Sequence, residues 1–239
     1  MQTTIITPTY NKHEFLPEAA ESVLRQTCPD WRWWLILDDA EEETKEIAYG
    51  YAKLDNRITI FEEKFISPWQ PCINELVTDR NPHHFRREAH IRNFYFPRVG
   101  TKYLSWLSDD DILEPCFVEV LTSKLEEKDD DIAFGFADVI IKQDGEWQLK
   151  RTHAPDCDLG LGQRVDPFTV IDGGQFLQTK RSWEKLRYDF NAYHGHTMPN
   201  LLDAVYMKNL AMHFTFYRVP VKVYTKRITY LSTFEKGDK

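Results

Sequence analysis

The sequence predicts an α/β protein with a mostly parallel central sheet flanked by helices. In the first half, short runs of apolar and β-branched residues alternate with longer stretches that carry apolar residues at helical spacing. In the second half, Asp144-Gly145 separates two strand-like runs, a pattern typical of a β-hairpin. We therefore expect a parallel sheet that continues into a smaller mixed region.

The first unit is a strand, a loop and a helix. Thr3–Thr7 is a β-branched run ended by Pro8, and Glu14–Gln26 places apolar residues on one helical face. The same alternation predicts strands at Trp33–Leu37, Arg57–Phe61 and Tyr103–Leu107, and helices at Glu42–Lys53, Glu88–Phe96 and Cys116–Glu127. Between Glu62 and Arg87 prolines interrupt any pattern, so we predict a loop with a short helix.

The second half combines strands and helices without a repeat. Strand-like runs flank the Asp144-Gly145 turn, and a last strand precedes the polar tail. The predicted strands are Ile132–Ile141, Glu146–Arg151 and Tyr217–Tyr224, and the predicted helices are Gly174–Thr179 and Asn200–Met212.

Composition and charge exclude several classes of function. With 239 residues and 42% hydrophobic content, the chain can build one well-packed core. The formal net charge of -8 argues against a broad nucleic-acid surface. The four cysteines lie far apart, which favours reduced thiols over a zinc site or a disulfide framework. No apolar run is long enough to span a bilayer and no signal peptide is recognisable, so we expect a cytoplasmic protein with at most peripheral membrane contact.

Polar residues follow three of the predicted strands. Pro8, Tyr10 and Asn11 follow the first, Asp38-Asp39 the second, and Asp109-Asp110-Asp111 a later one. Ligands of open α/β sheets bind outside the carboxyl ends of the strands. The sequence therefore predicts a polar ligand site at this edge, with groups suited to a nucleotide diphosphate.

The acidic triplet at 109–111 indicates a cation. Adjacent carboxylates raise each other's pKa unless a positive charge neutralises them. Mg²⁺ or Mn²⁺ held by one or two carboxylates, with phosphate oxygens as further ligands, is the natural partner. The alternative is a solvated turn that caps a helix, since Ser108 and the aspartates also suit that role.

Four segments in order resemble the family 2 glycosyltransferases of the GT-A fold. They are "TPTYNKHEFLPEAAESVLRQT", "WWLILDDA", Arg92-Asn93 and "YLSWLSDDD". The resemblance covers the first half of the chain. It implies one GT-A domain over residues 1–239, in which residues 1–112 bind nucleotide sugar and metal and residues 113–239 supply acceptor contacts and the base.

The resemblance also implies roles for individual donor-site residues. Pro8 and Tyr10 would lie against the nucleobase, and Asp39 would accept a hydrogen bond from its ring. Asp109 would approach the ribose and share the metal with Asp110, with Asp111 as a further helper. Ser108 stands where the family often has its first acid, which leaves the number of direct metal ligands open.

Arg92 resembles a basic residue that faces the donor. A guanidinium suits a phosphate because its planar donors bind two oxygens at once. A surface arginine on a helix is the alternative, and Arg86 and Arg87 are competing candidates.

Asp203 is the candidate catalytic base. Transfer requires a group that deprotonates the acceptor hydroxyl, and a carboxylate suffices. The segment "NLLDAVYMKNLA" resembles the late acidic motif of the family, although Leu202 replaces the acid often found beside it. Asp172 and Asp189 are alternative bases, and a solvated helical aspartate is the structural alternative for Asp203.

The expected function is inverting transfer of a sugar from a nucleotide diphosphate, by default a uridine diphosphate sugar, to a hydroxyl acceptor, with a glycan expected. One alternative is a catalytically inactive nucleotide-sugar-binding or interaction module on the same fold. A sugar-phosphate pyrophosphorylase is a second alternative, but such enzymes need a glycine-rich basic loop after the first strand, and this chain has "TPTYNKHEF" there.

Overall fold

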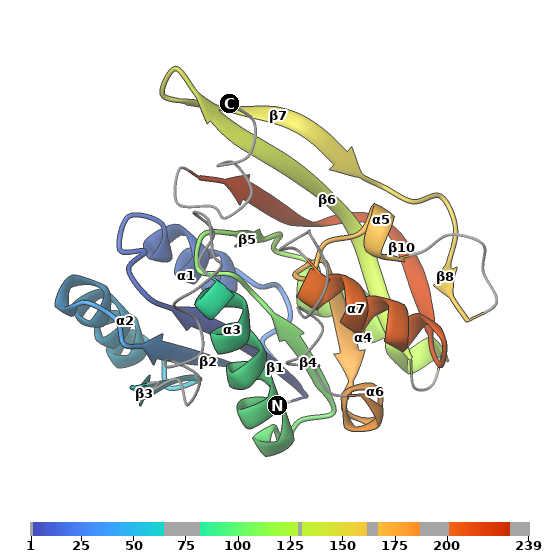
Figure 1. The fold of residues 1–239 in the computed structure, drawn as a ribbon, viewed down its shortest axis with the longest axis horizontal. Helices are drawn as coiled ribbons and strands as arrows, with labels where there is room; N and C mark the ends of the chain where they lie inside the picture. The colour runs from blue at the N-terminus through green and yellow to red at the C-terminus, as the bar shows by residue number, and fades with distance from the viewer. Residues whose placement is uncertain (1, 65–81, 129–130, 162–166, 187–200, 230–239) are drawn as a thin grey trace, which may run out of the picture.

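The computed structural model describes residues 2–64, 82–128, 131–161, 167–186 and 201–229. Within residues 82–87, 89, 168–169 and 201–205 only the backbone is described. Figure 1 shows the sheet with helices on both faces.

The first half follows the predicted alternation of strands and helices. The elements are β1 (Thr3–Thr9), α1 (Leu16–Leu24), β2 (Trp31–Asp38), α2 (Glu42–Leu54), β3 (Ile58–Glu63), α3 (Pro82–Tyr95), the 3₁₀ helix η2 (Phe96–Arg98) and β4 (Tyr103–Trp106). Each strand and helix predicted between residues 3 and 107 is confirmed, with ends that differ by a few residues. Helix α3 begins before Glu88 because Pro82 occupies a first-turn position, where its missing N–H costs nothing.

The second half is mixed. Its elements are β5 (Ile112–Leu113), α4 (Phe117–Lys128), β6 (Ile132–Gln143), β7 (Glu146–His153), β8 (Leu159–Gly160), α5 (Pro167–Val170), β9 (Phe176–Thr179), α6 (Lys180–Lys185), α7 (Leu201–Ala211) and β10 (Thr215–Ile228). The predicted helix at 200–212 is confirmed as α7. The last strand is longer than predicted, and this extension carries its C-terminal end to the acidic turn at 109–111.

One sheet joins both halves. Among the described residues its order is β3-β2-β1-β4-β9-β6-β10-β5, with β7 beside β6 and β8 beside β10. Strands β3, β2, β1 and β4 run parallel to one another, as do β6 and β10. Strand β9 is antiparallel to both β4 and β6. The predicted α/β architecture with a mixed second region is confirmed.

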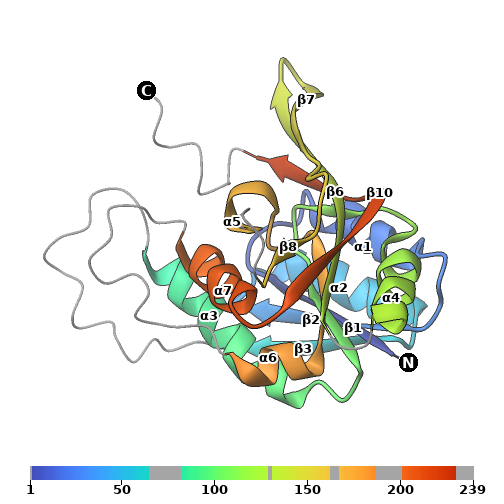
Figure 2. The same cartoon turned by 90° about the vertical axis from the view of Figure 1, so that its right-hand side faces the viewer.

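The sheet separates two apolar cores. Neighbouring residues on one strand point to opposite faces, so Ile5 and Leu35 belong to one core, and Ile6 and Ile36 to the other. Helices α1, α2 and α4 cover the first face, whereas α3, α6 and α7 cover the second (Figure 2). Both faces are therefore covered, as parallel sheets require.

The β6–β7 hairpin has the predicted turn. Asp144 and Gly145 have φ values of 52° and 88°, which is the pair of left-handed residues that a two-residue primed turn requires. Gln143 pairs with Glu146 across the turn. The hairpin prediction is confirmed.

The predicted helix at Gly174–Thr179 is wrong. Residues Phe176–Thr179 form β9, an inner strand whose four side chains are all buried. Pairing with β4 and β6 on its two sides satisfies its backbone groups, and this tertiary pairing outweighs the local preference. The helix begins immediately afterwards, as α6.

Candidate active site

The carboxyl ends of β2, β1 and β4 lie side by side at one edge of the sheet. Strand β1 pairs with β2 through Thr9 and Leu37 and with β4 through Ile6 and Trp106. All three strands run parallel, so the segments that follow them meet at this edge. The structure therefore gathers Tyr10, Asp39 and the 109–111 turn, as the sequence predicts.

Tyr10 and Asp39 are the accessible groups of this edge. Tyr10 is 49% exposed, and Pro8 is half-buried. Asp39 is exposed and has a φ of 55°, a left-handed conformation that aspartate tolerates better than most residues. Its backbone N–H donates to the Glu63 carbonyl at 2.8 Å, which fixes the turn after β2.

Asn11 connects the loops that follow β1 and β2. Its side-chain oxygen accepts a hydrogen bond from the Glu41 backbone N–H at 3.0 Å. His13 reinforces the connection, because its Nδ1 lies 2.6 Å from a Glu41 carboxylate oxygen. Asn11 thus fixes the geometry of the two loops that present Tyr10 and Asp39.

Asp109 and Asp110 are buried beneath this edge, each about 9% exposed. The Lys12 Nζ atom lies 2.5 Å from Asp110 Oδ2, and the Thr229 hydroxyl is 3.3 Å from the same oxygen. The acidic turn is therefore packed against both the loop after β1 and the end of β10, and it is not the solvated turn of the alternative interpretation.

The charge of this turn fits a bound cation. Burial, together with the neighbouring Asp110 carboxylate, raises the pKa of Asp109 to about 7, against the opposing effect of Lys12. Burial also raises the pKa of Asp111 to about 7. A further positive charge beside such buried carboxylates would favour their ionised form. A hard divalent ion with oxygen ligands would supply it.

A complete protein ligand set is not formed in the described part of the chain. No three His, Cys, Asp or Glu side chains of that part are grouped closely enough to hold a metal by themselves. One or two carboxylates that share an ion with phosphate oxygens and water would not form such a group. Asp110 and Asp109 are the residues that would hold it.

Asp111 faces β10. The Tyr224 hydroxyl donates to its Oδ2, and the Arg227 backbone N–H donates to its Oδ1 at 2.7 Å. Both carboxylate oxygens of this 2% exposed residue are thus used within the fold. Asp111 thus joins the acidic turn to the last strand.

Arg227 makes a second connection between β10 and the acidic turn. Its Nε donates to the Asp110 carbonyl, and its Nη1 lies 2.5 Å from the Glu18 carboxylate on α1. The guanidinium carbon is also 5.3 Å from the centre of the Phe15 ring. The residue is 2% exposed, so it is part of the packing around the site.

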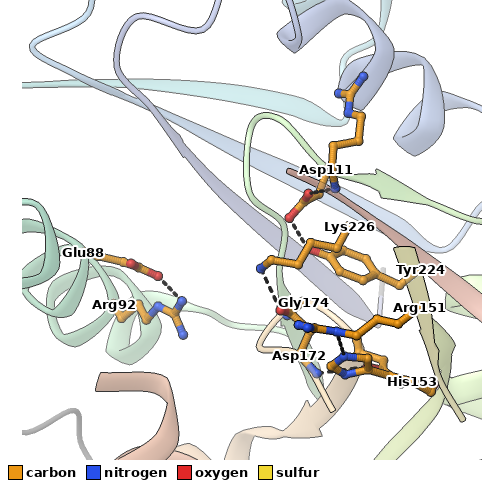
Figure 3. A network of polar contacts seen from close by, with 11 residues as sticks. Glu88, Arg92, Asp111, Arg151, His153, Asp172, Gly174, Tyr224 and Lys226 are labelled. Carbon is orange, nitrogen blue, oxygen red and sulfur yellow. Dashed lines mark hydrogen bonds and ion pairs between the residues drawn. The ribbon is translucent and has the colours of Figure 1, made fainter. Parts of the chain in front are cut away.

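A buried polar network extends from Asp111 along β10 to Asp172, shortly before β9 (Figure 3). Lys226 Nζ lies 2.6 Å from Asp172 Oδ2, and Asp172 Oδ1 accepts from the Gly174 N–H at 3.2 Å. Burial raises the pKa of Asp172, but the Lys226 ammonium outweighs it and the net pKa is below the ordinary value. A lowered pKa makes Asp172 a weak base, which disfavours this alternative to Asp203.

Arg92 is inside the protein. It is 1% exposed, pairs with Glu88 one helical turn away, and places its guanidinium carbon 3.9 Å from the centre of the Trp106 ring. The alternative of a surface arginine is therefore wrong. Figure 3 shows the Glu88–Arg92 pair beside β4, in the same view as the Lys226–Asp172 pair. Its contact with a donor stays a prediction.

Several predicted residues lie outside the part whose side chains are described. Asp203 belongs to the first turn of α7, of which only the backbone is described. The side chains of Arg86 and Arg87 are likewise undescribed, and Asp189 lies outside the described residues.

Sequence reasoning missed Lys12, Tyr224, Lys226 and Arg227. Lys12 could have been predicted from the sequence, because it directly follows Asn11 and its positive charge suits a predicted diphosphate site. The three residues of β10 gave no local signal. They reach the site because the long last strand pairs with β5, next to the acidic turn.

Comparison with known proteins connects this edge to one family. The model of glycosyl transferase family 2 matches residues 4–65, which include Pro8, Tyr10 and Asp39. A Bacillus subtilis (strain 168) protein named as a teichuronic acid biosynthesis glycosyltransferase, TuaG, is 26% identical over 154 residues. The alignment covers 64% of this chain and 53% of the relative. Over residues 4–65 the chain is therefore similar to glycosyl transferase family 2.

A second curated relative is similar over a shorter stretch. Glycosyltransferase GlyG of Streptococcus pneumoniae serotype 4 (strain ATCC BAA-334 / TIGR4) is 22% identical over 132 residues, which cover 55% of this chain and 38% of the relative. The chain thus spans about half or less of the length of these curated relatives.

Solved structures confirm that this chain has the GT-A fold. S. aureus TarS 1-349 in complex with UDP-GlcNAc superposes with a TM-score of 0.70 at 11% identity, over 100% of this chain and 62% of that one. The mannosyltransferase PcManGT from Pyrobaculum calidifontis, in complex with GDP-Man and Mn²⁺, has a TM-score of 0.61 at 12% identity, over 97% and 58%. In the described part of this chain, no helix is long and apolar enough to cross a membrane.

Proposed function

We propose that this chain is an inverting, metal-dependent glycosyltransferase that moves a sugar from a nucleotide diphosphate to a hydroxyl acceptor. The observation that carries the proposal is the position of Asp109 and Asp110. They are buried at the carboxyl end of β4, beside the loops after β1 and β2 that match the family model. The two exposed groups above them, Tyr10 and Asp39, have the chemistry to bind a nucleobase.

The donor is a nucleoside diphosphate sugar. Tyr10 offers an exposed aromatic face for stacking, and the Asp39 carboxylate accepts a hydrogen bond from a ring N–H. Among the structural neighbours, TarS is in complex with UDP-GlcNAc and PcManGT with GDP-Man. We take a uridine diphosphate sugar as the first candidate and a guanosine diphosphate sugar as the second.

The metal is Mn²⁺ or Mg²⁺, held by Asp110 and Asp109. When bound, it would neutralise the negative charge that the departing diphosphate acquires. The two carboxylates would hold it at the carboxyl end of β4, where Lys12 and Arg227 also contact Asp110. PcManGT, in complex with Mn²⁺, supports this assignment.

The transfer is a single displacement. Asp203 takes the proton from the acceptor hydroxyl, and the acceptor oxygen forms a bond to the anomeric carbon. The bond from that carbon to the phosphate oxygen breaks at the same time, and its electron pair leaves with the nucleoside diphosphate. One displacement inverts the configuration at the anomeric carbon. A glycan is the proposed acceptor, in keeping with the name of the TuaG relative.

Calorimetric titration with uridine, guanosine, thymidine and cytidine diphosphates, each with and without Mn²⁺, tests the donor site. We expect one diphosphate to bind, tightly only with Mn²⁺, and Asp110→Asn to weaken this binding at least about tenfold, or about 1.4 kcal/mol. Asp144→Asn, at the tip of the hairpin, is the matched control and should bind normally. No binding by any nucleotide would overturn the proposal and favour an interaction module on the same fold.

A further inference from the structure

Lys12 is held in place by its backbone. Its carbonyl oxygen accepts hydrogen bonds from the N–H groups of Phe15 and Leu16, each at 2.9 Å, where α1 begins. The preceding Asn11 side chain is bonded to the loop after β2. The lysine side chain therefore extends from a fixed point towards the acidic turn.

The Lys12 ammonium forms an ion pair with Asp110, a carboxylate that would also bind the proposed metal. Nζ lies 2.5 Å from Asp110 Oδ2, with side chains that are 17% and 13% exposed. Lys12 also acts on the Asp109 carboxyl, whose pKa it lowers against the effects of burial and Asp110. One ammonium thus supplies positive charge to both proposed metal ligands.

Binding of a divalent cation at Asp110 would disrupt the Lys12–Asp110 ion pair. Two positive groups beside one carboxylate repel each other, and the repulsion is strong because these side chains are largely removed from water. A bound diphosphate would relieve this repulsion, because its oxygens can bind the metal and also accept hydrogen bonds from the ammonium group. Lysine is suited to this change because its ammonium is a compact charge on a flexible stem.

We propose that Lys12 and the divalent cation compete for Asp110, so that the metal binds weakly to the nucleotide-free protein and tightly together with the nucleotide. The inference rests on the proposed function and adds a coupling between its two ligands. In the nucleotide-free state Lys12 neutralises Asp110. In the loaded state the metal takes Asp110, and the Lys12 ammonium moves to an oxygen of the diphosphate. The coupling is reciprocal, so the metal and the nucleotide strengthen each other's binding equally.

Titration of Mn²⁺ alone, followed by electron paramagnetic resonance, tests the competition in the full chain. We expect Lys12→Met to bind Mn²⁺ about tenfold more tightly than the wild type, because the competing charge is gone. The same variant should bind uridine or guanosine diphosphate more weakly at saturating Mn²⁺. A merely structural defect would weaken both interactions, so the opposite directions identify competition.

Three further variants complete the experiment. Lys12→Arg keeps the charge and should retain weak Mn²⁺ binding, whereas Lys124→Met, which removes a lysine paired with Glu127 at 3.5 Å on α4, should behave as the wild type. Asp110→Asn introduced into Lys12→Met should abolish the gain in Mn²⁺ affinity. Lys12→Gln serves in place of Lys12→Met if the latter does not fold.

The outcomes separate this inference from the proposed function. If the wild type binds nucleotide with Mn²⁺ but Lys12→Met shows unchanged or weaker Mn²⁺ affinity, competition is overturned and the transferase proposal stands. If the wild type binds nucleotide equally with and without Mn²⁺, Lys12 is a permanent replacement for the metal and the competition is also overturned. If the wild type binds no nucleotide, both proposals fail.

Discussion

The Tyr224 hydroxyl of β10 donates a hydrogen bond to the carboxylate of Asp111, 113 positions away in the chain. Both residues are buried, and the Arg227 backbone N–H uses the other carboxylate oxygen. This contact connects the acidic turn at 109–111 to the last strand. The geometry of Asp109 and Asp110 therefore depends on residues from the far end of the sequence.

Tyr224→Phe should destabilise the protein by about 1–3 kcal/mol, because it leaves a buried carboxylate oxygen without its donor. Urea unfolding followed by fluorescence measures the change. Tyr49→Phe is the matched control, since Tyr49 also donates to a carboxylate, that of Glu62, but at an exposed position. Equal effects of the two substitutions would show that the burial of the Asp111 contact is unimportant.

Gly174→Ala should also destabilise the protein. A Cβ atom at this position would lie 2.5 Å from Cζ and Oη of Tyr224, and overpacking of this kind costs about 1–3 kcal/mol. Gly50→Ala, in α2, meets nothing within 4 Å and should stabilise the helix by about 0.5–1 kcal/mol. Thermal unfolding should thus show shifts of opposite sign, and a neutral Gly174→Ala would contradict the close packing of Tyr224.

Because of His153, the free energy of unfolding should decrease as the pH falls below about 6.5. Burial lowers the pKa of His153, and the Arg151 guanidinium, whose Nε donates to His153 Nε2 at 2.8 Å, lowers it further. The unfolded chain then binds the proton first as the pH falls, so stability decreases from the unfolded pKa down to the folded pKa. Urea unfolding of His153→Gln between pH 7.5 and 5 should show a smaller acid loss than the wild type.

His13→Gln is the control for this prediction because it has the opposite sign. The hydrogen bond with Glu41 raises the pKa of His13, so its contribution is present at low pH and is lost as the pH rises through the folded pKa. Its removal should increase the acid loss of stability. A change in the same direction for both variants would contradict the pKa assignments.

Asp203→Asn should lower the rate of transfer about 10²–10⁴-fold, because the acceptor hydroxyl loses its base. Affinity for the nucleotide diphosphate should remain that of the wild type, since the proposed donor contacts lie after β1, β2 and β4. Initial rates with a radiolabelled donor, together with calorimetry, distinguish the two effects. Retained activity would remove Asp203 from the role of base, and Asp144→Asn controls for the loss of one carboxylate.

The local sequence pattern was sufficient to predict the strands and helices in the first half of the fold. Parallel strands alternate with helices, and a strand such as Thr3–Thr9 is recognisable from its own residues because both faces are buried. The turn at Asp144-Gly145 was equally readable, since a primed turn requires left-handed residues. The groups after the strands could be placed at one edge because parallel strands end there together.

The sequence alone determined the α/β class, the polar edge with Tyr10, Asp39 and the acidic turn, and the resemblance to family 2. Tertiary structure alone decided the rest. β9 is a strand because β4 and β6 flank it. Lys12 meets Asp110 because β1 pairs with β4, and Tyr224 and Arg227 meet the acidic turn only after β10 has joined the sheet. The physical reason is range. Turn chemistry and hydrophobic periodicity act between near neighbours in sequence, whereas the partners of a buried charge are set by which distant strands pair.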